Sequence, residues 1–433
     1  MDEHIKKLKH TIEVSTSPWH AAKEAISQLD ASGYTGLSWD CEWDLRAGGK
    51  YYVCPYGTSV FAFRIGENFS GVPSFTLASA HIDTPGLRIK QNAAITTSAG
   101  TRLNAEVYGG AIYHTWFDRP LSIAGRVALK TSDAFHPHME LIDFRRPVVE
   151  LPNLAFHLNR SVNEQNPLNA QIDMLPLCGT SPKEESDYLL SRIASELNEN
   201  PDNILCYELC VYNTENLTCT GFSNDMFMAP RIDNLSSVQA CLTGLAESSS
   251  SDGIQLIALF DHEEIGSRSK NGAQGSLLPF TMERICNSLD ISRNAYMTNM
   301  THNYYLSLDV AHALHPNHPE KSDLTTALPL NTGFAVKCSS KQVYCSDSEM
   351  AGIVLQLAQS NDIPCRLNYM RSDSVGGGTV GPIVSSAIPM HSADIGIPVY
   401  AMHSAMETAG TLDQYHLEKF MKAYFSIFLP LKV

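Results

Sequence analysis

The sequence contains no pair of cysteines in the Cys-x-x-Cys spacing, although its 433 residues include 11 cysteines. These cysteines are scattered from Cys41 to Cys365, and their number is odd. Zinc ribbons need closely spaced cysteines and disulfide frameworks favour an even number, so the pattern indicates neither. We therefore expect a protein of a reducing compartment.

Long apolar segments are missing as well. Residues 1–10 are charged and contain no apolar signal segment. No uninterrupted apolar run approaches the roughly 20 residues that are needed to span a bilayer. We therefore predict a soluble, cytoplasmic protein without a membrane partner.

Basic residues are scarce relative to acidic ones: 31 Lys and Arg against 46 Asp and Glu give a formal net charge of −15. Binding to a phosphate backbone rests on Lys and Arg that neutralise the phosphates, so we predict no nucleic-acid partner. The 43% hydrophobic and 18% charged content is ordinary for a globular protein, and the length allows two or three domains.

What the chain does contain is an apolar run, residues 254–260, followed within a few positions by Glu263 and Glu264. Two adjacent carboxylates on an extended or turning backbone point in different directions, so one can bind a cation while the other faces a substrate. This division of roles is typical of a metallohydrolase. A bare Glu-Glu pair is common on solvated surfaces, however, so other segments have to show whether this pair belongs to a metal site.

Four further metal-compatible residues stand beside predicted helices and strands. Three of them follow an apolar or strand-like segment: His81, Asp309 and His403. The fourth, Asp233, precedes a helix-like segment. Open α/β sheets gather their sites at the carboxyl ends of their strands. Asp233 with Asn234 could instead be a simple helix N-cap.

The rest of the pattern indicates an α/β fold with a β-rich interruption. Ser17 and Pro18 predict a helix start, and Ser346 or Ser348 is predicted to cap a helix over 346–358. The other expected elements are strands near 51–64, 75–80, 254–260 and 364–370, helices within 1–30 and over 235–245, a closing helix with Leu417, Phe420, Met421, Tyr424 and Phe428, and short β-like pieces at 94–97, 121–129 and 148–151.

Several segments together resemble the M18 metallo-aminopeptidases, the aspartyl aminopeptidase family, over most of the chain. They are residues 79–90 (SAHIDTPGLRIK), 108–110 with 115–127, 230–235, the Glu-Glu segment and 401–404. The resemblance implies an α/β mixed-sheet zinc-peptidase (phosphorylase/hydrolase-like) catalytic domain, formed by 1–91 and 229–433. Between these parts, residues 92–228 would form an inserted β-rich dimerisation and oligomerisation domain.

The resemblance also implies a ligand set for two Zn²⁺ per chain, with Mn²⁺ or Co²⁺ as possible substitutes. Asp233 would bridge the ions, His81 and Asp309 would complete one site, and Glu264 and His403 the other. A catalytic zinc site leaves one position open for water. In related dinuclear peptidases the peptide bond after the bridging Asp is cis, and we expect the same here.

Two carboxylates beside these ligands receive catalytic roles. A ligating imidazole usually donates its second N–H to a carboxylate that fixes its tautomer and orientation, and we assign this role to Asp83 beside His81. The family pattern makes Glu263 the general base, which would collect a proton from water and deliver it to the leaving amine. Spacing alone leaves the reverse assignment open, with Glu263 as ligand and Glu264 as base.

Other residues are assigned to the substrate cleft. Residues 376–381 (GGGTVG) lack the Gly-Lys-Ser/Thr of a phosphate loop, so we predict a cleft wall in which Gly378 and Thr379 bind the peptide substrate. Lys337 is a candidate partner for an acidic substrate side chain, although a solvated Lys is the commoner fate. His312, His315 and His318 are interpreted as loop residues near the active site, because the family motif assigns the metal ligand to Asp309.

His157 lies inside the insertion and would most often be structural. The resemblance implies that it reaches the active site of a neighbouring subunit and helps to hold the carbonyl oxygen. It also implies a homo-oligomer, a tetrahedral dodecamer whose active sites face an enclosed chamber.

The predicted function is a dinuclear zinc aminopeptidase that releases N-terminal residues, preferentially Asp and Glu, from peptides. Family members commonly carry an Arg-Glu pair shortly after the last histidine, whereas Met406 stands at the arginine position here. The alternatives are therefore an aminopeptidase of the same family with broad, neutral or basic preference, or an inactive scaffold of the same fold. The intact ligand set with Glu263 argues against the scaffold.

Overall fold

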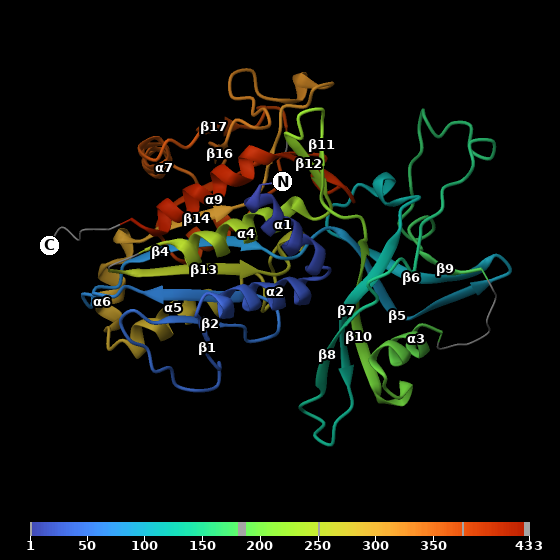
Figure 1. Cartoon of the computed structure of the whole chain (residues 1–433), viewed down its shortest axis with the longest axis horizontal. Coiled ribbons are helices and arrows are strands. Elements are labelled where there is room, and N and C mark those ends of the chain that lie inside the picture. Colours follow the sequence, from blue (N-terminus) through green and yellow to red (C-terminus); the bar gives the residue numbers. More distant parts are fainter. Residues whose placement is uncertain (1, 181–187, 250–251, 375, 428–433) are drawn as a thin grey trace.

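Two parts lie side by side in the computed structural model, a layered α/β part and a smaller β-rich part (Figure 1). The structure describes residues 2–180, 188–249, 252–374 and 376–427. The β-rich part, in green and teal, interrupts the layered part in sequence. The predicted α/β fold class with an inserted β-rich part is confirmed.

The layered part is built on a mixed sheet that has nine strands among the described residues. In spatial order they are β1 (Thr35–Gly36), β2 (Lys50–Val53), β3 (Val60–Ile65), β13 (Ile254–Phe260), β4 (Phe75–His81), β14 (Tyr304–Leu308), β18 (His391–Gly396), β16 (Phe334–Cys338) and β17 (Cys365–Tyr369). The neighbours β13, β4, β14 and β18 run parallel. Every residue of β4 and β13 is buried, as expected for parallel strands that are covered on both faces.

Helices cover both faces of this sheet. One hydrophobic cluster packs against α1 (Glu3–Val14), α2 (Pro18–Ala31), α4 (Ile232–Glu247), α7 (Ser348–Ser360) and α9 (Thr411–Phe425). A second cluster, on other side chains of the same strands, packs against α5 (Leu277–Ser288), α6 (Arg293–Thr298) and α8 (Val380–Ala387). Alternate residues along β3 and β13 belong to different clusters, since successive side chains of a strand point to opposite faces. The result is a three-layer α/β/α arrangement.

Local capping explains where two of the predicted helices begin. The Ser17 side chain accepts the N–H of His20 at 3.4 Å and Pro18 is the first helical residue of α2, as predicted. The predicted cap of α7 at Ser346 or Ser348 is wrong, because the Asp347 carboxylate accepts the N–H of Met350 at 2.8 Å. Helix α9 agrees with the predicted closing helix, and Phe428 lies outside the described residues.

The β-rich part has a six-stranded sheet among the described residues and a hydrophobic cluster of its own. Its strands, in spatial order, are β8 (His138–Asp143), β7 (Leu121–Leu129), β10 (Ile204–Asn213), β5 (Gly86–Thr97), β6 (Gly100–Tyr108) and β9 (Leu177–Gly179), with α3 (Tyr188–Leu197) packed beside them. Within residues 148–151, Val149 and Glu150 form isolated bridges rather than a strand. A boundary at 91/92 would cut β5, and the separate role of 92–228 stays a prediction.

A third sheet of five described strands lies at the end of the first. It contains β11 (Thr218–Thr220), β12 (Met226–Ala229), β20 (Glu407–Gly410), β19 (Pro398–Tyr400) and β15 (Ala311–His312). Strand β11 and all of β12 except Ala229 fall inside the predicted insertion, but β12 pairs with β20 of the catalytic part, and β11 pairs with β12. Five short 3₁₀ helices complete the described elements: η1 (Tyr113–Trp116), η2 (Pro201–Asn203), η3 (Glu263–Ile265), η4 (Met300–His302) and η5 (Pro319–Lys321).

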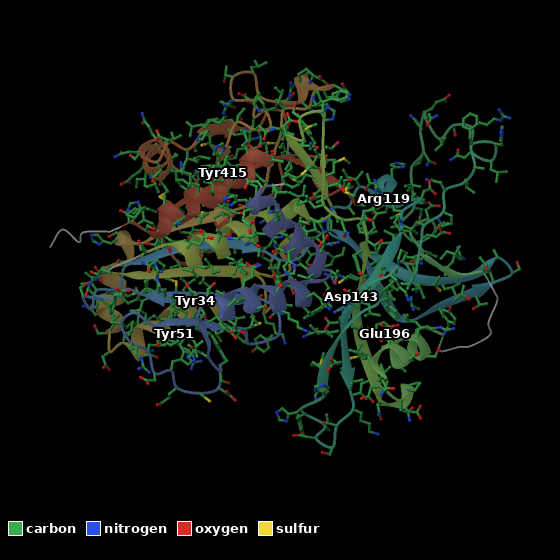
Figure 2. All side chains as sticks on the ribbon, in the orientation of Figure 1. Tyr34, Tyr51, Arg119, Asp143, Glu196 and Tyr415 are labelled. Atoms are coloured by element: carbon green, nitrogen blue, oxygen red, sulfur yellow. The ribbon has the colours of Figure 1, made fainter. Side chains whose placement is uncertain are left out.

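Asp143 joins the two parts of the molecule. In Figure 2 its label lies where the layered part meets the β-rich part. Its carboxylate accepts a hydrogen bond from the Tyr212 hydroxyl at 2.7 Å and one from the Thr16 hydroxyl at 2.9 Å. Thr16 stands between α1 and α2, so this contact fixes the second sheet against the N-terminal helices.

Candidate active site

Three of the predicted site segments lie at the ends of adjacent parallel strands. His81 is the last residue of β4, Asp309 follows β14, and η3, with Glu263 and Glu264, follows β13 after a short turn. Because β13, β4 and β14 are neighbours, their carboxyl ends meet at one edge of the sheet. These residues therefore lie at the edge of the sheet that the sequence pattern indicated.

Asp233 and His403 reach the same place from other elements. Asp233 stands in the first turn of α4 but has non-helical dihedral angles, and the Asp233–Asn234 peptide bond is cis, as expected. His403 follows β19 and has a φ of +69°. His262, directly before η3, has a φ of +63°. Left-handed conformations of non-glycine residues are uncommon and cluster at functional sites.

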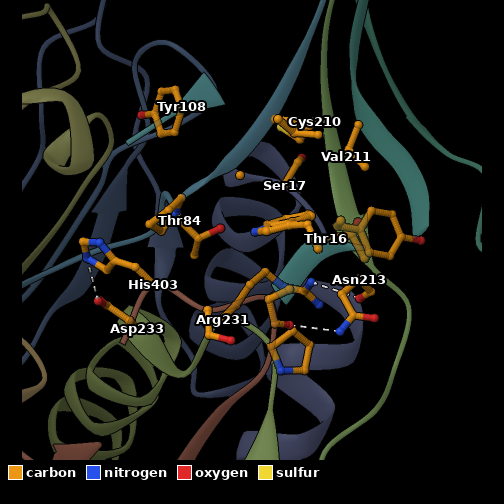
Figure 3. Close-up of a pocket in the computed structure, with 18 of the residues that line it drawn as sticks. Thr16, Ser17, Thr84, Tyr108, Cys210, Val211, Asn213, Arg231, Asp233 and His403 are labelled. Carbon is orange, nitrogen blue, oxygen red and sulfur yellow. Dashed lines mark hydrogen bonds and ion pairs between the residues drawn. The ribbon is translucent and has the colours of Figure 1, made fainter. Parts of the chain in front are cut away.

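Asp233 lies between the two histidines. Its Oδ1 is 3.2 Å from Nε2 of His81, and its Oδ2 is 3.5 Å from Nε2 of His403. Asp309 Oδ1 is 3.7 Å from the same nitrogen of His81, and Glu264 Oε2 is 3.5 Å from that of His403. The side chains thus form one group around His81 and another around His403, with Asp233 in both. Figure 3 shows His403 and Asp233 facing each other.

The electrostatics of this cluster fit divalent cations. Burial and neighbouring carboxylates raise the pKa of Glu263 to about 8 and that of Glu264 well above its usual value. Glu264 Oε1 is buried without a hydrogen-bond partner among the described residues. Burial also opposes ionisation of Asp309, but the charge of Lys337 holds the pKa of Asp309 below its ordinary value. Carboxylate and imidazole donors suit zinc, and cations would relieve the repulsion between the carboxylates.

Asp83 acts on the cluster differently from the prediction. Nδ1 of His81 lies 2.9 Å from the backbone carbonyl of Asp83 and 3.6 Å from its carboxylate, so the carbonyl makes the hydrogen bond. The Asp83 carboxylate instead accepts the backbone N–H groups of Glu263 and Glu264, each at 3.1 Å, and the Tyr108 hydroxyl at 2.7 Å. The Asp83 segment therefore orients both the imidazole and the turn that carries the two glutamates.

Glu407 was not among the predicted site residues. It is 2% exposed, and its carboxylate accepts the backbone N–H groups of Asp233 and His403, both at 2.9 Å. It therefore ties together two segments that are 170 residues apart in sequence. The signal in the sequence is its position four residues after His403, as the second residue of the family's Arg-Glu pair. Only the first residue of this pair, where Met406 stands in place of the arginine, enters the prediction from sequence.

A cavity of about 430 Å³ opens in front of the cluster. Its walls include the five predicted ligands and Glu263, together with Lys337, Tyr344, Gly378, Thr379 and Met402. A much smaller cavity of about 30 Å³ lies behind His403 and Asp233, between them and the β-rich part (Figure 3). The smaller one has room for about one water molecule, so of these two cavities only the larger can admit a substrate.

Comparison with known proteins decides the family. The model of the family described as "Aminopeptidase I zinc metalloprotease (M18)" matches residues 11–425. The chain belongs to the M18 family. It is accordingly a metallo-aminopeptidase, a hydrolase of N-terminal peptide bonds, and the predicted resemblance is confirmed.

Relatives of this M18 chain match over nearly its full length. A protein named "Probable M18 family aminopeptidase 2" from Clostridium acetobutylicum is 36% identical over 98% of the chain and 99% of its own length. Ape4, solved in complex with Nbr1, has a TM-score of 0.93 at 29% identity, covering 98% of this chain and 85% of its own. The S. cerevisiae mApe1 dodecamer has the same fold, with a TM-score of 0.83 at 23% identity and coverages of 98% and 96%.

The residues predicted to bind substrate in this M18 chain lie in the large cavity, although some have partners within the protein. Lys337 is 3% exposed and not solvated, and its Nζ donates to the carbonyl oxygens of Asp309 at 3.2 Å and Val310 at 3.1 Å. The Thr379 hydroxyl donates to Asp394 at 2.6 Å. A Cβ at Gly378 would meet nothing within 4 Å, so packing within the chain does not require glycine there.

The remaining predicted residues lie farther from the cluster. His157 is exposed in a run of turns after residue 155, and it lines none of the described cavities of the single chain. His312 lines the large cavity, whereas His315 and His318 line a neighbouring one. These three histidines belong to no metal-compatible group among the described residues. None of the helices in the described part of the chain is long and apolar enough to cross a membrane.

Proposed function

We propose that this M18 metallo-aminopeptidase holds two zinc ions, with Asp233 as the shared ligand. His81 and Asp309 would complete one site, and Glu264 and His403 the other. The observation that carries the proposal is that the two carboxylate oxygens of Asp233 face different histidines, at 3.2 and 3.5 Å. Mn²⁺ or Co²⁺ could bind the same oxygen and nitrogen donors.

Glu263 is the proposed general base, and Glu264 the ligand. Glu264 shares a group with Asp233 and His403, whereas Glu263 belongs only to a group with His81 and Glu264. When bound, the ions would polarise the scissile carbonyl and lower the pKa of a bound water. The Glu263 carboxylate, held in place through the bond from its N–H to Asp83, would accept a proton and pass it to the leaving amine.

The proposed substrates are peptides with an N-terminal Asp or Glu. Lys337 is a buried cation in the wall of the large cavity, and Gly378 and Thr379 line the same cavity. Because Asp309 already pairs with Lys337 at 3.4 Å, a substrate carboxylate would have to share this cation. A broad, neutral or basic preference is the alternative.

A panel of aminoacyl substrates tests this function directly. We expect purified protein with added zinc, manganese or cobalt to release N-terminal residues, with the highest kcat/KM for Asp and Glu. Acetylated peptides should not be cleaved, since an aminopeptidase requires a free amino terminus. Fastest release of neutral or basic residues would replace the acidic preference, and no release with any metal would support an inactive scaffold.

The proposed assembly is a tetrahedral homo-dodecamer with residues 92–228 as the oligomerisation domain. Beside His157, the side chains of Leu154, Phe156 and Leu158 are 64, 52 and 75% exposed. Apolar side chains gathered on one surface segment are typical of a protein interface. The mApe1 relative was solved as a dodecamer, which supports the proposal. We place the enzyme in the cytoplasm, consistent with 11 free cysteines among the described residues.

Subunit complementation tests whether His157 acts across an interface. Glu263→Gln chains and His157→Phe chains should each be nearly inactive, and co-assembly should restore part of the activity, because a hybrid interface can pair an intact Glu263 with a neighbour's intact His157. Light scattering gives the assembly state, and peptide hydrolysis gives the activity. A fully active monomer, or co-assembled variants without any recovery, would contradict the shared site.

A further inference from the structure

A second cavity, of about 490 Å³, adjoins the one that contains the metal cluster. His312 and Met402 line both cavities and so form the boundary between them. The outer wall comes from η5 and the residues after it, from residues 368–371 with Ser374, and from β19 with the two residues that follow it. The second cavity therefore begins where the catalytic cavity ends.

The walls of this second cavity carry one cation that is available to a ligand. Lys321 lines the cavity, and its side chain makes no hydrogen bond or ion pair within the described ranges. The other cation, Arg371, is already neutralised, because its guanidinium binds Asp373 with two hydrogen bonds at 2.8 and 2.6 Å. Arg371 also donates to the backbone carbonyl of Glu320, which fixes the turn that positions Lys321.

One oxygen of the acidic side chain in the cavity wall, Asp323, is occupied. Oδ1 of Asp323 accepts the N–H and hydroxyl groups of both Thr325 and Thr326, at 2.9 to 3.2 Å. These bonds hold the pKa of Asp323 at about 2 and direct that oxygen into its own turn. The cavity thus presents an ammonium group that no carboxylate of the described residues contacts directly, although its charge also acts on Glu320 and Asp373. Such a group would attract a carboxylate rather than a second cation.

Aromatic rings and an imidazole form the rest of the wall. The His315 ring lies 5.8 Å from the Tyr400 ring and 5.2 Å from the His318 ring. Nδ1 of His315 accepts the N–H of Asn317 at 3.2 Å, so in the neutral ring Nε2 carries the proton and is the free donor. An apolar wall with a few polar donors is typical of a site for an organic ligand.

The position of the cavity indicates which part of a substrate it receives. An aminopeptidase substrate has a single residue before the scissile bond, and the proposed function places this residue beside Lys337 in the catalytic cavity. Everything after the scissile bond has to leave that cavity. We propose that the second cavity binds the leaving part of the peptide and that Lys321 binds a carboxylate there. This carboxylate is either an acidic side chain at position 2 or 3 or the terminal carboxylate of a short peptide.

This inference rests on the proposed function, and peptides with a constant first residue test it separately. The first residue is the one that the panel finds best, while positions 2 and 3 are Glu, Ala or Lys, each with a free or an amidated carboxyl terminus. We expect wild type to prefer Glu over Lys by about 5-fold in kcat/KM, the effect of one partly exposed charge pair. A preference for the free over the amidated end of Ala peptides would identify the terminal carboxylate as the ligand, and an effect confined to Glu would identify the side chain.

Substitution of Lys321 assigns the effect to this cavity. Lys321→Met should abolish the preference and Lys321→Glu should reverse it, while kcat for an amidated all-Ala tail stays unchanged. Lys23→Met, which removes an exposed lysine on α2, is the matched control and should keep the wild-type preference. Binding of the same peptides to Glu263→Gln protein gives a readout that does not depend on turnover.

Two results would overturn the inference. One is a wild-type preference that Lys321→Glu leaves intact, because the downstream charge would then be recognised elsewhere. The other is a change in preference for the first residue in Lys321→Glu, because the cavity would then hold the N-terminal side chain. Failure of wild type to release any N-terminal residue would instead contradict the proposed function, and peptide binding would still show whether Lys321 recognises a carboxylate.

Discussion

Glu263→Gln should lower kcat by roughly 10²-fold or more, the scale of a lost general base. The substitution keeps the size of the side chain but removes its capacity to accept a proton. The backbone bond from Glu263 N–H to Asp83 does not involve the side chain, so the η3 turn should be retained. Steady-state kinetics measure the loss, and elemental analysis should find the wild-type metal content.

Glu264→Gln is the contrasting variant. Glu264 Oε2 lies 3.5 Å from Nε2 of His403 and Oε1 is buried without a hydrogen-bond partner in the described part of the molecule, so this side chain has the position of a ligand. We expect Glu264→Gln to lose metal as well as activity. If Glu264→Gln retained its metal and Glu263→Gln lost it, Glu263 would be the ligand and Glu264 the base. Near-normal turnover of Glu263→Gln would remove Glu263 as the base.

The edge of the sheet at which the site forms could be predicted from sequence because the pattern there is local. Residues 75–80 and 254–260 are mostly apolar runs, which predicts strands that are buried on both faces, and parallel strands end at the same edge. His81 and the Glu-Glu pair therefore had to lie near each other. The cis bond after Asp233, in contrast, came from the family resemblance alone.

Contacts between distant segments could not be predicted. Glu407 binds the backbone of Asp233 across 174 positions, and nothing local marks a buried glutamate as a backbone acceptor. At Asp83 the backbone carbonyl, not the carboxylate, binds His81, and the carboxylate binds the η3 turn instead. This arrangement depends on how the ends of β4 and β13 approach each other. Likewise, the helix cap at Asp347 lies one residue from the predicted serines. A helix boundary cannot be predicted from sequence to within one residue.

Asp233→Ala should remove both metal ions from each chain. If Asp233 bridges two sites, its loss takes one oxygen from each of them, whereas loss of any other predicted ligand affects one site. We expect the metal content to fall from close to two ions per chain to nearly none. The fall in kcat/KM should be on the order of 10³-fold or more, because the ions supply several kcal/mol of transition-state stabilisation.

Asp413→Ala separates metal loss from unfolding. Asp413 is also a buried aspartate, and its carboxylate accepts the backbone N–H groups of Asn331 at 2.7 Å and Gly333 at 2.8 Å, but it lines neither the metal cluster nor the large cavity. This variant leaves two donors without their acceptor, so it should lower the Tm while retaining two ions. Elemental analysis and thermal unfolding of both variants give the comparison. A single tightly held ion that persists in Asp233→Ala would contradict the dinuclear site, because a shared carboxylate cannot be removed without disturbing both ions.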